Sequence, residues 1–390
     1  MKMSQADIDI LKTEIEYILG RKIITSKDCI DLAEDIFKKT GLLVSANTLR
    51  RCFGLVKSVY PSSQGTLNIL AIYCGFTSFE ELIKYKHSSQ KFDKKEDIKL
   101  LKYFSVVFQN VTVQNSKDPT FIKLTHATID FLNQHTDIAY EFQKVIVKTP
   151  NGKRFYFEHF VNIDKLNSFY GDGLRYYLAE NKGEEAQIFG HSLLCFRYWL
   201  TMQTENLKYH YYKLADFKVS CETPAPIAAR YFAAKLFIAQ VITTNFPNPV
   251  SEAAIFYDCA KKNAEQNNML FYFDVIFLEA LILTRHYTDA AAHITASLAR
   301  YALSTPDINN DYLNSIKLLQ AVTFANIGCE KKASELFEQV NPLEFYFIKK
   351  QFYMLLYTTL GIKLKKNKQN ENQITFLVAD TGFVKLLNLF

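Results

Sequence analysis

Apolar residues follow a helical spacing from the beginning of the chain. Between Ser4 and Leu19 the apolar residues recur every third or fourth position, and Gly20 follows as a stop. The same spacing restarts in four shorter segments before residue 86, and most of these segments are bounded by Ser, Thr or Gly. The pattern predicts five short helices that form one compact all-α domain over residues 1–86.

The second and third of these helices have the clearest ends. The second is expected to end at Gly41, with Ile30 and Phe37 among the residues on its inner face. The third, within SANTLRRCFG, is expected to begin at the cap Ser45 and to end at Gly54. Only a short connection, GLLV, separates the two helices.

A hydrophilic stretch at residues 87–97 predicts a linker, and helical periodicity is nearly continuous over residues 98–390. We therefore expect an α-solenoid of paired helices in this region, with an irregular helical bundle as the alternative. Gly171-Asp172-Gly173 is expected to form a turn. Residues 142–158 are the exception to helical periodicity, because aromatic and β-branched runs flank Thr149-Pro150-Asn151-Gly152, which predicts a small β-hairpin.

Two segments near the end of the chain share a spacing of small and aromatic residues. The first contains Tyr287, Ala290 and Ile294. The second has a tight-turn glycine, a small packing residue, an aromatic residue and a closing proline at Gly328, Ala333, Phe337 and Pro342. This spacing is similar to the tetratricopeptide pattern, in which small residues let paired helices approach closely. Ala290 and Ala333 are further apart than one standard repeat of about 34 residues, so the repeats are divergent.

The N-terminal segments also contain an ordered set of motif residues. Leu32-Ala33 is followed by Gly41, by a polar helix start at Ser45–Leu49, and by a closing run from Pro61-Ser62 to Leu82. This order resembles the helix-turn-helix domain of the phage-repressor (Xre-type) class, although the first motif helix is about one turn longer than usual. The resemblance implies a recognition helix that reads DNA and a homodimer that reads two half-sites.

Charge is distributed unevenly in the same region. No acidic residue lies between Asp35 and Glu80, whereas several Lys and Arg do. Lys and Arg bind phosphate groups, and short polar side chains at a helix start can reach base edges or phosphates. The residues expected to contact DNA are Ser45, Asn47, Thr48, Arg50, Arg51 and Lys57. The alternative is that Arg50 and Arg51 only solvate one face of a scaffold helix.

Composition narrows the class of protein further. The 390 residues include only 13 Gly and 9 Pro, which disfavours an all-β protein, and the net charge of +6 permits an acidic partner without requiring one. The seven cysteines are scattered without a CxxC pair, so we expect reduced thiols in a cytoplasmic protein. The most apolar stretch, Leu270–Leu283, contains Asp274 and Glu279, so we expect a buried helix there and no membrane association.

No motif in the sequence indicates catalysis. Phosphate loops, dinucleotide fingerprints, nucleophile elbows and zinc-type cysteine pairs are all missing. His286 and His293 share a helix face, but no carboxylate lies between them at ligand spacing. We therefore expect a protein without enzyme activity, cofactor or metal site.

A cluster of tyrosines is the candidate partner-binding feature of the array. Tyr209, Tyr211 and Tyr212 lie on a predicted helix that is too polar to be buried all round. Tyrosine is favoured where a protein surface binds a peptide. The alternative is that these rings only fill gaps between helices.

Two functions fit these observations. The first is a transcriptional regulator whose N-terminal domain binds DNA and whose array senses or docks a peptide or protein. This layout is similar to that of regulators that join an Xre-type domain to tetratricopeptide repeats. The second is a non-enzymatic scaffold for protein–protein interaction, in which the N-terminal bundle caps the array.

Overall fold

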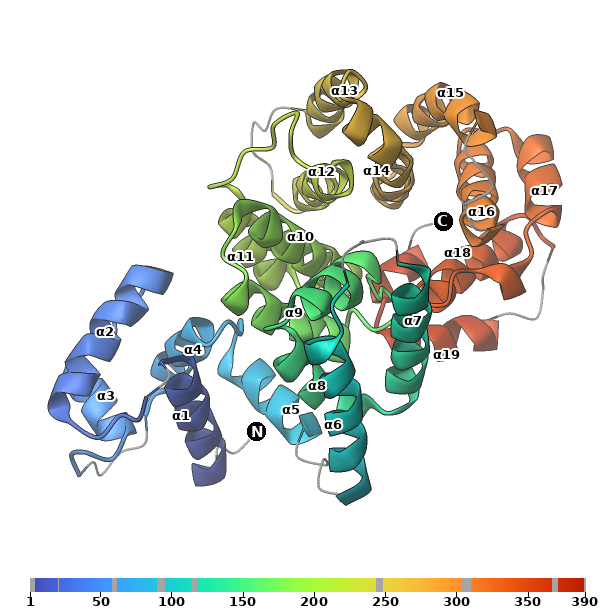
Figure 1. The fold of residues 1–390 in the computed structure, drawn as a ribbon. Helices are drawn as coiled ribbons and strands as arrows, with labels where there is room; N and C mark the ends of the chain where they lie inside the picture. The colour runs from blue at the N-terminus through green and yellow to red at the C-terminus, as the bar shows by residue number, and fades with distance from the viewer. Residues whose placement is uncertain are drawn as a thin grey trace. The chain divides into compact units, whose positions relative to one another are not determined.

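The computed structural model of the chain is helical, and no strand occurs among the residues that it describes (Figure 1). This confirms the predicted all-α class. The chain divides into two compact units, residues 1–102 and residues 103–390. The described residues are 4–19, 21–57, 62–89, 95–113, 118–242, 248–303, 310–366 and 371–388.

The described helices of the first unit are short and have local end signals. They are α1 (Gln5–Leu19), α2 (Ser26–Thr40), α3 (Ala46–Cys52), α4 (Gln64–Tyr73), α5 (Phe79–Ser89) and the beginning of α6 (Lys95–Asn110). Thr25 opens α2, because its hydroxyl accepts a hydrogen bond from the N–H of Asp28 and its own N–H donates one to the Asp28 carboxylate. Gly41 ends α2 as expected, with a left-handed φ of 70°.

The predicted linker at residues 87–97 is only partly described. Residues 87–89 belong to α5 and residues 95–97 belong to α6. Residues 90–94 lie outside the described residues. Where the segment is described, it is therefore helical.

The core of the first unit comes from one apolar face of each helix. Leu11 and Ile15 of α1 are fully buried, and so are Leu32 of α2, Leu49 of α3 and Leu67 of α4. α1 packs on α4 and α5, while α2 packs on α3 and α4. Removal of these side chains from water is the main stabilising contribution to such a small domain.

Two apolar residues of α2 do not join this core, contrary to the sequence-based prediction. Ile30 is 43% exposed and Phe37 is 52% exposed. The buried face of α2 is set by Cys29 and Ile36, each of which is completely covered. Ile30 and Phe37 follow these two residues by one position and therefore point about 100° away from them around the helix.

The second unit is an array of helices. After the end of α6, its described helices are α7 (Pro119–Gln134), α8 (Thr136–Ile146), η1 (Gly152–His159), α9 (Phe169–Glu180), α10 (Glu184–Leu200), α11 (Thr204–Leu214), α12 (Ala225–Ala239), α13 (Pro249–Ala260), α14 (Ala264–Leu283), α15 (Tyr287–Leu303), α16 (Asn310–Asn326), α17 (Glu330–Glu338), η2 (Pro342–Glu344), α18 (Lys350–Lys363), α19 (Glu371–Thr381) and η3 (Val384–Asn388). In the described ranges, no helix is both long enough and apolar enough to cross a membrane.

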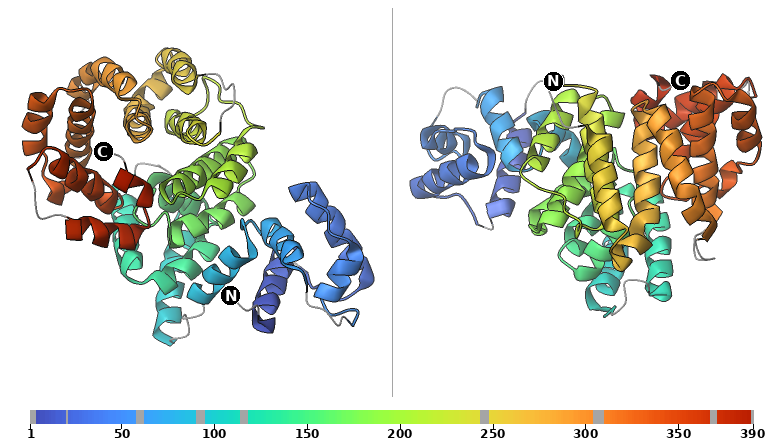
Figure 2. Two further views of the ribbon diagram at one scale, coloured as in Figure 1. Left: turned by 180° about the vertical axis from the view of Figure 1, so that it is seen from behind. Right: turned by 90° about the horizontal axis from the view of Figure 1, so that it is seen from above.

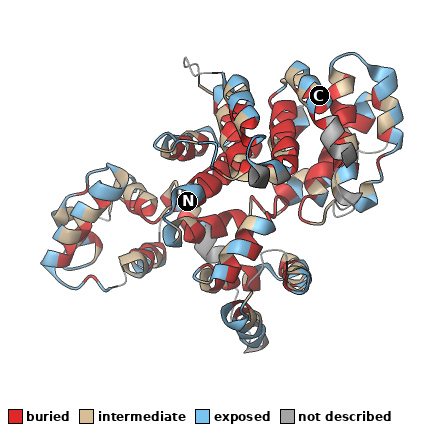
Figure 3. Ribbon diagram, turned by 45° about the horizontal axis from the view of Figure 1, so that its top comes forward, coloured by how far each residue is buried: buried red, intermediate tan, exposed pale blue. Residues whose placement is uncertain are grey.

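The array closes on itself. α10, α12, α14, α16 and α18 pack beside one another in turn, and the helix after each packs on its outer side (Figure 1, Figure 2). The ring of Phe352 in α18 lies 6.0 Å from that of Phe196 in α10, and η3 also contacts α10. Asp164 accepts hydrogen bonds from the N–H groups of Gln351 and Phe352 in the first turn of α18. The last helices therefore pack on the first ones, and buried residues concentrate on the inner helices (Figure 3).

Residues 142–158 do not form the predicted β-hairpin. Residues up to Ile146 belong to α8, and Gly152–His159 form a π-helix, η1. Phe155, Tyr156 and Phe157 are all buried, so no exposed face reveals the period that would distinguish a strand from a helix. A Cβ at position 152 would lie 2.0 Å from the carbonyl oxygen of Ile146, so glycine there permits the close return of the chain.

Gly171-Asp172-Gly173 lies within α9 and not in a turn, so that prediction is wrong as well. A Cβ at Gly171 would lie 1.8 Å from the carbonyl oxygen of Leu166. The glycine therefore serves close packing and does not end a helix. The first turn of α9 carries Asp172 into the interior, where it contacts Arg197 of α10.

One cysteine pair departs from the expected reduced state. Cys221, in the loop before α12, forms a disulfide with Cys259 of α13, and their Cα atoms are 5.8 Å apart. The two residues are 38 positions apart in the sequence, a spacing that corresponds to no recognised motif. The prediction of reduced thiols is wrong for this pair.

Replacing Ala333 with leucine should lower the free energy of unfolding by about 1–3 kcal/mol, because overpacking forces closely packed helices apart. Ala333 is completely buried in α17, which packs on α16. Urea denaturation of the full chain measures the loss. Lys331→Leu adds the same side chain at an exposed position of α17 and is the matched control. Equal stability of the two variants would contradict a close approach of α16 and α17 at Ala333.

Candidate functional site

The segment predicted to be the recognition helix is α3, a helix of seven residues. Ser45 caps it, since its Oγ accepts a hydrogen bond from the N–H of Thr48 at 3.1 Å. The hydroxyl of Thr48 lies 2.9 Å from the same oxygen, so the two side chains also bond to each other. Leu49 and Cys52 are buried and fix the opposite side of the helix in the core.

The outward side of α3 carries the other residues of the candidate DNA site. Asn47 and Arg51 are exposed, and Arg50 is half-buried, with Nη1 donating a hydrogen bond to Asn47 Oδ1 at 2.8 Å. Lys57, in the segment after α3, is exposed. Among the residues that the structure describes, Arg50, Arg51 and Lys57 form no ion pair. Acidic side chains in this part of the chain therefore do not neutralise the cations.

Exposed apolar side chains adjoin α3 in the sequence. Leu43, two residues before the cap Ser45, is 79% exposed, and Leu55 and Val56 after α3 are exposed too. In a major groove such side chains can contact the methyl group of thymine. An exposed apolar patch also suits a protein partner, so these residues alone do not choose between DNA and protein.

The three tyrosines of the candidate partner surface differ in how far they are exposed on α11. Tyr211 is buried, Tyr209 is half-buried, and Tyr212 is 59% exposed. Burial raises the pKa of Tyr211 to about 12, and the ammonium of Lys213 lies 5.7 Å from the ring centre of Tyr209. Tyr209 and Tyr212 are three positions apart and lie on the same side of the helix, whereas Tyr211 points about 100° away from Tyr212.

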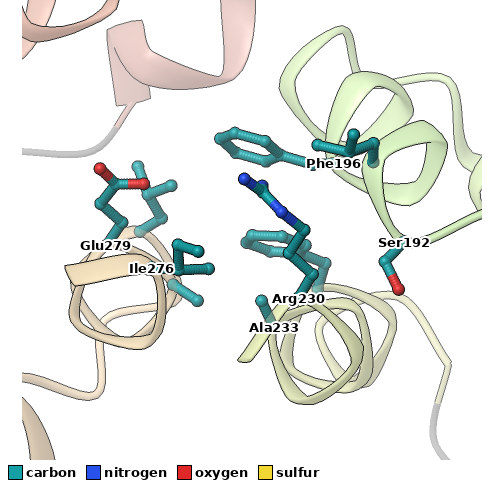
Figure 4. Close-up of a pocket in the computed structure, with 10 residues that line it drawn as sticks. Ser192, Phe196, Arg230, Ala233, Ile276 and Glu279 are labelled. Carbon is teal, nitrogen blue, oxygen red and sulfur yellow. The ribbon is translucent and has the colours of Figure 1, made fainter. Parts of the chain in front are cut away.

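A pocket lies between the inner helices α10, α12 and α14 of the array (Figure 4). Most of its wall is apolar, and its polar residues are Ser192 of α10, Arg230 of α12 and Glu279 of α14. Figure 4 shows Arg230 extending from α12 into the space between Phe196 and Glu279. The pocket therefore combines an apolar wall with a charged group on each side of its interior.

Glu279 is neutralised by residues of the array itself. Its carboxylate accepts hydrogen bonds from Lys349 Nζ at 2.8 and 3.1 Å and one from the hydroxyl of Tyr353. Burial raises the pKa of Tyr353, so this hydroxyl keeps its proton and remains a donor. Lys349 immediately precedes α18 and Tyr353 lies in its first turn, so the cluster ties α14 to α18.

Arg230 differs from Glu279, because its guanidinium makes no hydrogen bond or ion pair within the described parts of the chain. Its Cζ lies 5.7 Å from the ring centre of Phe189. Burial lowers the pKa of Arg230, and Tyr170 and Glu279 partly oppose that change. Arginine nevertheless stays protonated in proteins. Arg230 is thus a partly buried positive charge without a partner of opposite sign at hydrogen-bonding distance.

Two other buried polar clusters lie among α8, α9, α10 and α11. Asp172 accepts a hydrogen bond from Arg197, and His191 and His210 are joined by a hydrogen bond of 2.9 Å between their Nδ1 atoms. No group of three potential metal ligands occurs in the described ranges. We assign both clusters to the packing of the helices.

Neither Arg230 nor Glu279 is among the site residues predicted from the sequence. The available signal is a charged residue inside an apolar helix, namely Arg230 within APIAARYFAAKLFIA and Glu279 within Leu270–Leu283. A buried charge requires a group that compensates it, so the sequence predicts a polar or charged partner for Arg230 and another for Glu279. The identity of that partner is a matter of tertiary structure, since Lys349 is 70 residues from Glu279.

Comparisons of the chain with protein-family models, with curated proteins and with solved structures found no match.

Proposed function

We propose that the chain is a DNA-binding transcriptional regulator. Residues 1–86 act as a helix-turn-helix-like domain, and the tetratricopeptide-like array senses or docks a peptide or protein. The observation that carries DNA binding is the exposed side of α3, where Arg51 and the following Lys57 have no acidic partner among the described residues. Such cations bind DNA phosphates. A homodimer would present two copies of α3 to two half-sites, and this role requires the chain to act in the cytoplasm.

The cations have different roles in this proposal. Arg50 and Arg51 point about 100° apart on α3, so they cannot contact the same group. Arg50 bonds to Asn47, and together they offer donors to a base edge. Arg51 and Lys57 are exposed and suit phosphate contacts, which position the helix on the duplex.

The array supports a sensing role through its helix pairs and its interior. The inner helices pack in succession, and Ala290 and Ala333 are buried where paired helices meet. Arrays of this kind use their inner surface for ligands. The pocket at Arg230 provides a place for a polar group on that surface.

Replacing Arg51 and Lys57 together with alanine should weaken DNA binding and reduce its salt dependence by about two units of slope, because each lost phosphate contact removes about one unit. Binding is measured as the electrophoretic mobility shift of genomic DNA fragments by the purified full chain, at salt concentrations from about 50 to 200 mM. Both side chains are exposed, so the circular dichroism spectrum should not change.

The matched control for this experiment replaces Lys84 of α5 and Lys99 of α6 with alanine. Both lysines are exposed, so the control removes the same amount of positive charge. This control should leave affinity and slope close to those of the unaltered chain. Equal losses from both double variants would indicate diffuse charge attraction without a docked helix. No mobility shift by the unaltered chain at low salt would favour the scaffold, in which the N-terminal bundle caps the array.

A further inference from the structure

We propose that the pocket between α10, α12 and α14 binds a small carboxylate whose remaining part is apolar, and that Arg230 holds the carboxylate. Such a ligand is the signal to which the array of the proposed regulator would respond, and to that extent its role rests on the proposed function. Two sources share this chemistry: the free C-terminus of a peptide that ends in an apolar residue, and a free aromatic or aliphatic acid.

The charges around the pocket leave one positive charge unmatched. Glu279 is negative, but both of its oxygens already accept hydrogen bonds from Lys349. Tyr170 and Tyr312, the other groups that act electrostatically on Arg230, are uncharged at neutral pH. Arg230 and Lys349 thus carry two positive charges against one negative charge. One bound carboxylate makes the site neutral.

Partial burial strengthens Arg230 as an anion-binding group. A guanidinium that has lost part of its hydration gains more from a charge-assisted hydrogen bond than a fully exposed one does. Its planar fork can donate two parallel N–H···O bonds to a carboxylate. The ring of Phe189, 5.7 Å from Cζ, limits the orientations of the guanidinium. The donor is therefore placed before the ligand arrives.

The rest of the wall indicates what is attached to the carboxylate. The large apolar side chains of the wall are those of Leu193, Phe196, Phe237, Ile276 and Leu283. Ala233 and Ala280 are the small residues of the wall. The wall is apolar except at Ser192, Arg230 and Glu279, so the part of the ligand beyond the carboxylate is apolar as well.

A single cation and an apolar wall favour a carboxylate over a phosphate. A phosphate carries up to two negative charges and offers three acceptor oxygens, which one arginine can satisfy only in part. Lys349 does not supply the second cation, because its ammonium already bonds to Glu279. Inorganic phosphate should therefore bind more weakly than an apolar acid.

Isothermal titration calorimetry of the full chain tests the carboxylate directly. N-Acetylphenylalanine represents a peptide C-terminus, 3-phenylpropionate represents a free acid, and N-acetylphenylalaninamide is the uncharged control. At least one acid should bind about tenfold more tightly than the amide, because it gains charge-assisted hydrogen bonds. The more tightly bound of the two acids identifies the source of the ligand.

Three variants distinguish the effect of the charge of Arg230 from the effect of the space in the pocket. Arg230→Gln should abolish the preference for acid over amide, whereas Arg154→Gln, which alters an exposed arginine of η1, should preserve it. Ala233→Leu fills the pocket without changing its charge and should block the binding of acid and amide alike. This variant also tests the site if Arg230→Gln does not fold.

Several results would overturn the carboxylate site: no binding of either acid at millimolar concentration, equal binding of acid and amide, or binding that survives both Arg230→Gln and Ala233→Leu. DNA binding is measured separately, by the mobility shift of the same preparation. Acid binding without a DNA shift overturns the regulator and leaves the pocket. A DNA shift without acid binding overturns the carboxylate site and leaves the proposed regulator.

Discussion

Replacing Asp172 with alanine should lower the free energy of unfolding by about 3–5 kcal/mol, because it removes a buried carboxylate that pairs with buried cations. Asp172 Oδ1 lies 2.7 Å from Arg197 Nη1 and 3.6 Å from Arg175 Nη2. The hydroxyl of Tyr140 donates a hydrogen bond to Oδ2 at 3.2 Å. The three charged side chains are all buried, so water cannot replace the lost carboxylate.

Urea denaturation of the full chain measures this loss. Asp130→Ala is the control, because the contact of Asp130 with His126 is at the surface and such pairs contribute at most about 1 kcal/mol. Adding Arg197→Met to Asp172→Ala removes one of the cations that pair with Asp172 and should restore part of the stability. If Asp172→Ala costs no more than Asp130→Ala, the cluster does not hold α9 on α10.

Helix ends are the part of this fold that the sequence predicts best, because their signals are local. Gly41 and Gly54 have φ angles of 70° and 76°, which glycine adopts without strain, and both follow helices at the expected places. Ser45 caps α3 through the N–H of Thr48, only three residues away. The position of α3 therefore follows from neighbouring residues, while its binding of DNA stays a prediction.

The buried side of each element is less predictable, because it depends on what packs against it. Apolar character does not distinguish Ile30 from Cys29, yet only Cys29 is buried. The aromatic run Phe155–Phe157 is buried on all sides, which removes the alternation that separates strands from helices. The β-hairpin prediction depended on that alternation and on the turn residues, and tertiary packing around Gly152 produced a π-helix instead.

The pocket in the array depends on contacts that sequence spacing does not encode. Arg230 and Glu279 belong to different helices, and the group that neutralises Glu279 comes from a third. A charged residue within an apolar helix shows that its charge must be compensated by another group. It does not show which residue provides that group. The candidate tyrosines were chosen because their helix is polar, and this does not show which of the rings are buried: Tyr211 is buried, while Tyr212 is exposed.

The contribution of a buried histidine pair to the stability of the array should decrease as the pH falls below about 6.5. The Nδ1 atoms of His191 and His210 are 2.9 Å apart, so one ring must accept a hydrogen bond through an unprotonated nitrogen. Burial lowers the pKa of His191 to about 3, and Lys213 and Lys182 contribute to the same shift. The folded chain therefore keeps His191 neutral at pH values where the unfolded chain protonates it.

The sign of the effect follows from proton binding in the two states. Above about pH 6.5 the imidazole is neutral in both states and the contribution is constant. As the pH falls from 6.5 towards 3, only the unfolded state gains the proton, so stability falls by about 1.4 kcal/mol per pH unit. Asp164 has the opposite effect on stability. Burial raises its pKa to about 6, so as the pH falls the folded chain binds this proton before the unfolded chain does, and the folded state gains stability.

A variant isolates His191 from these other groups. Glutamine at position 191 keeps a donor and an acceptor but cannot take up a proton, so His191→Gln removes the titration of this residue. Between about pH 7 and pH 5, the unaltered chain should lose about 2 kcal/mol more of its unfolding free energy than the variant loses. Urea denaturation at several pH values measures both chains, and the contribution of Asp164 cancels in their difference. A difference that stays constant over this range would show that the proton affinity of His191 does not change on folding.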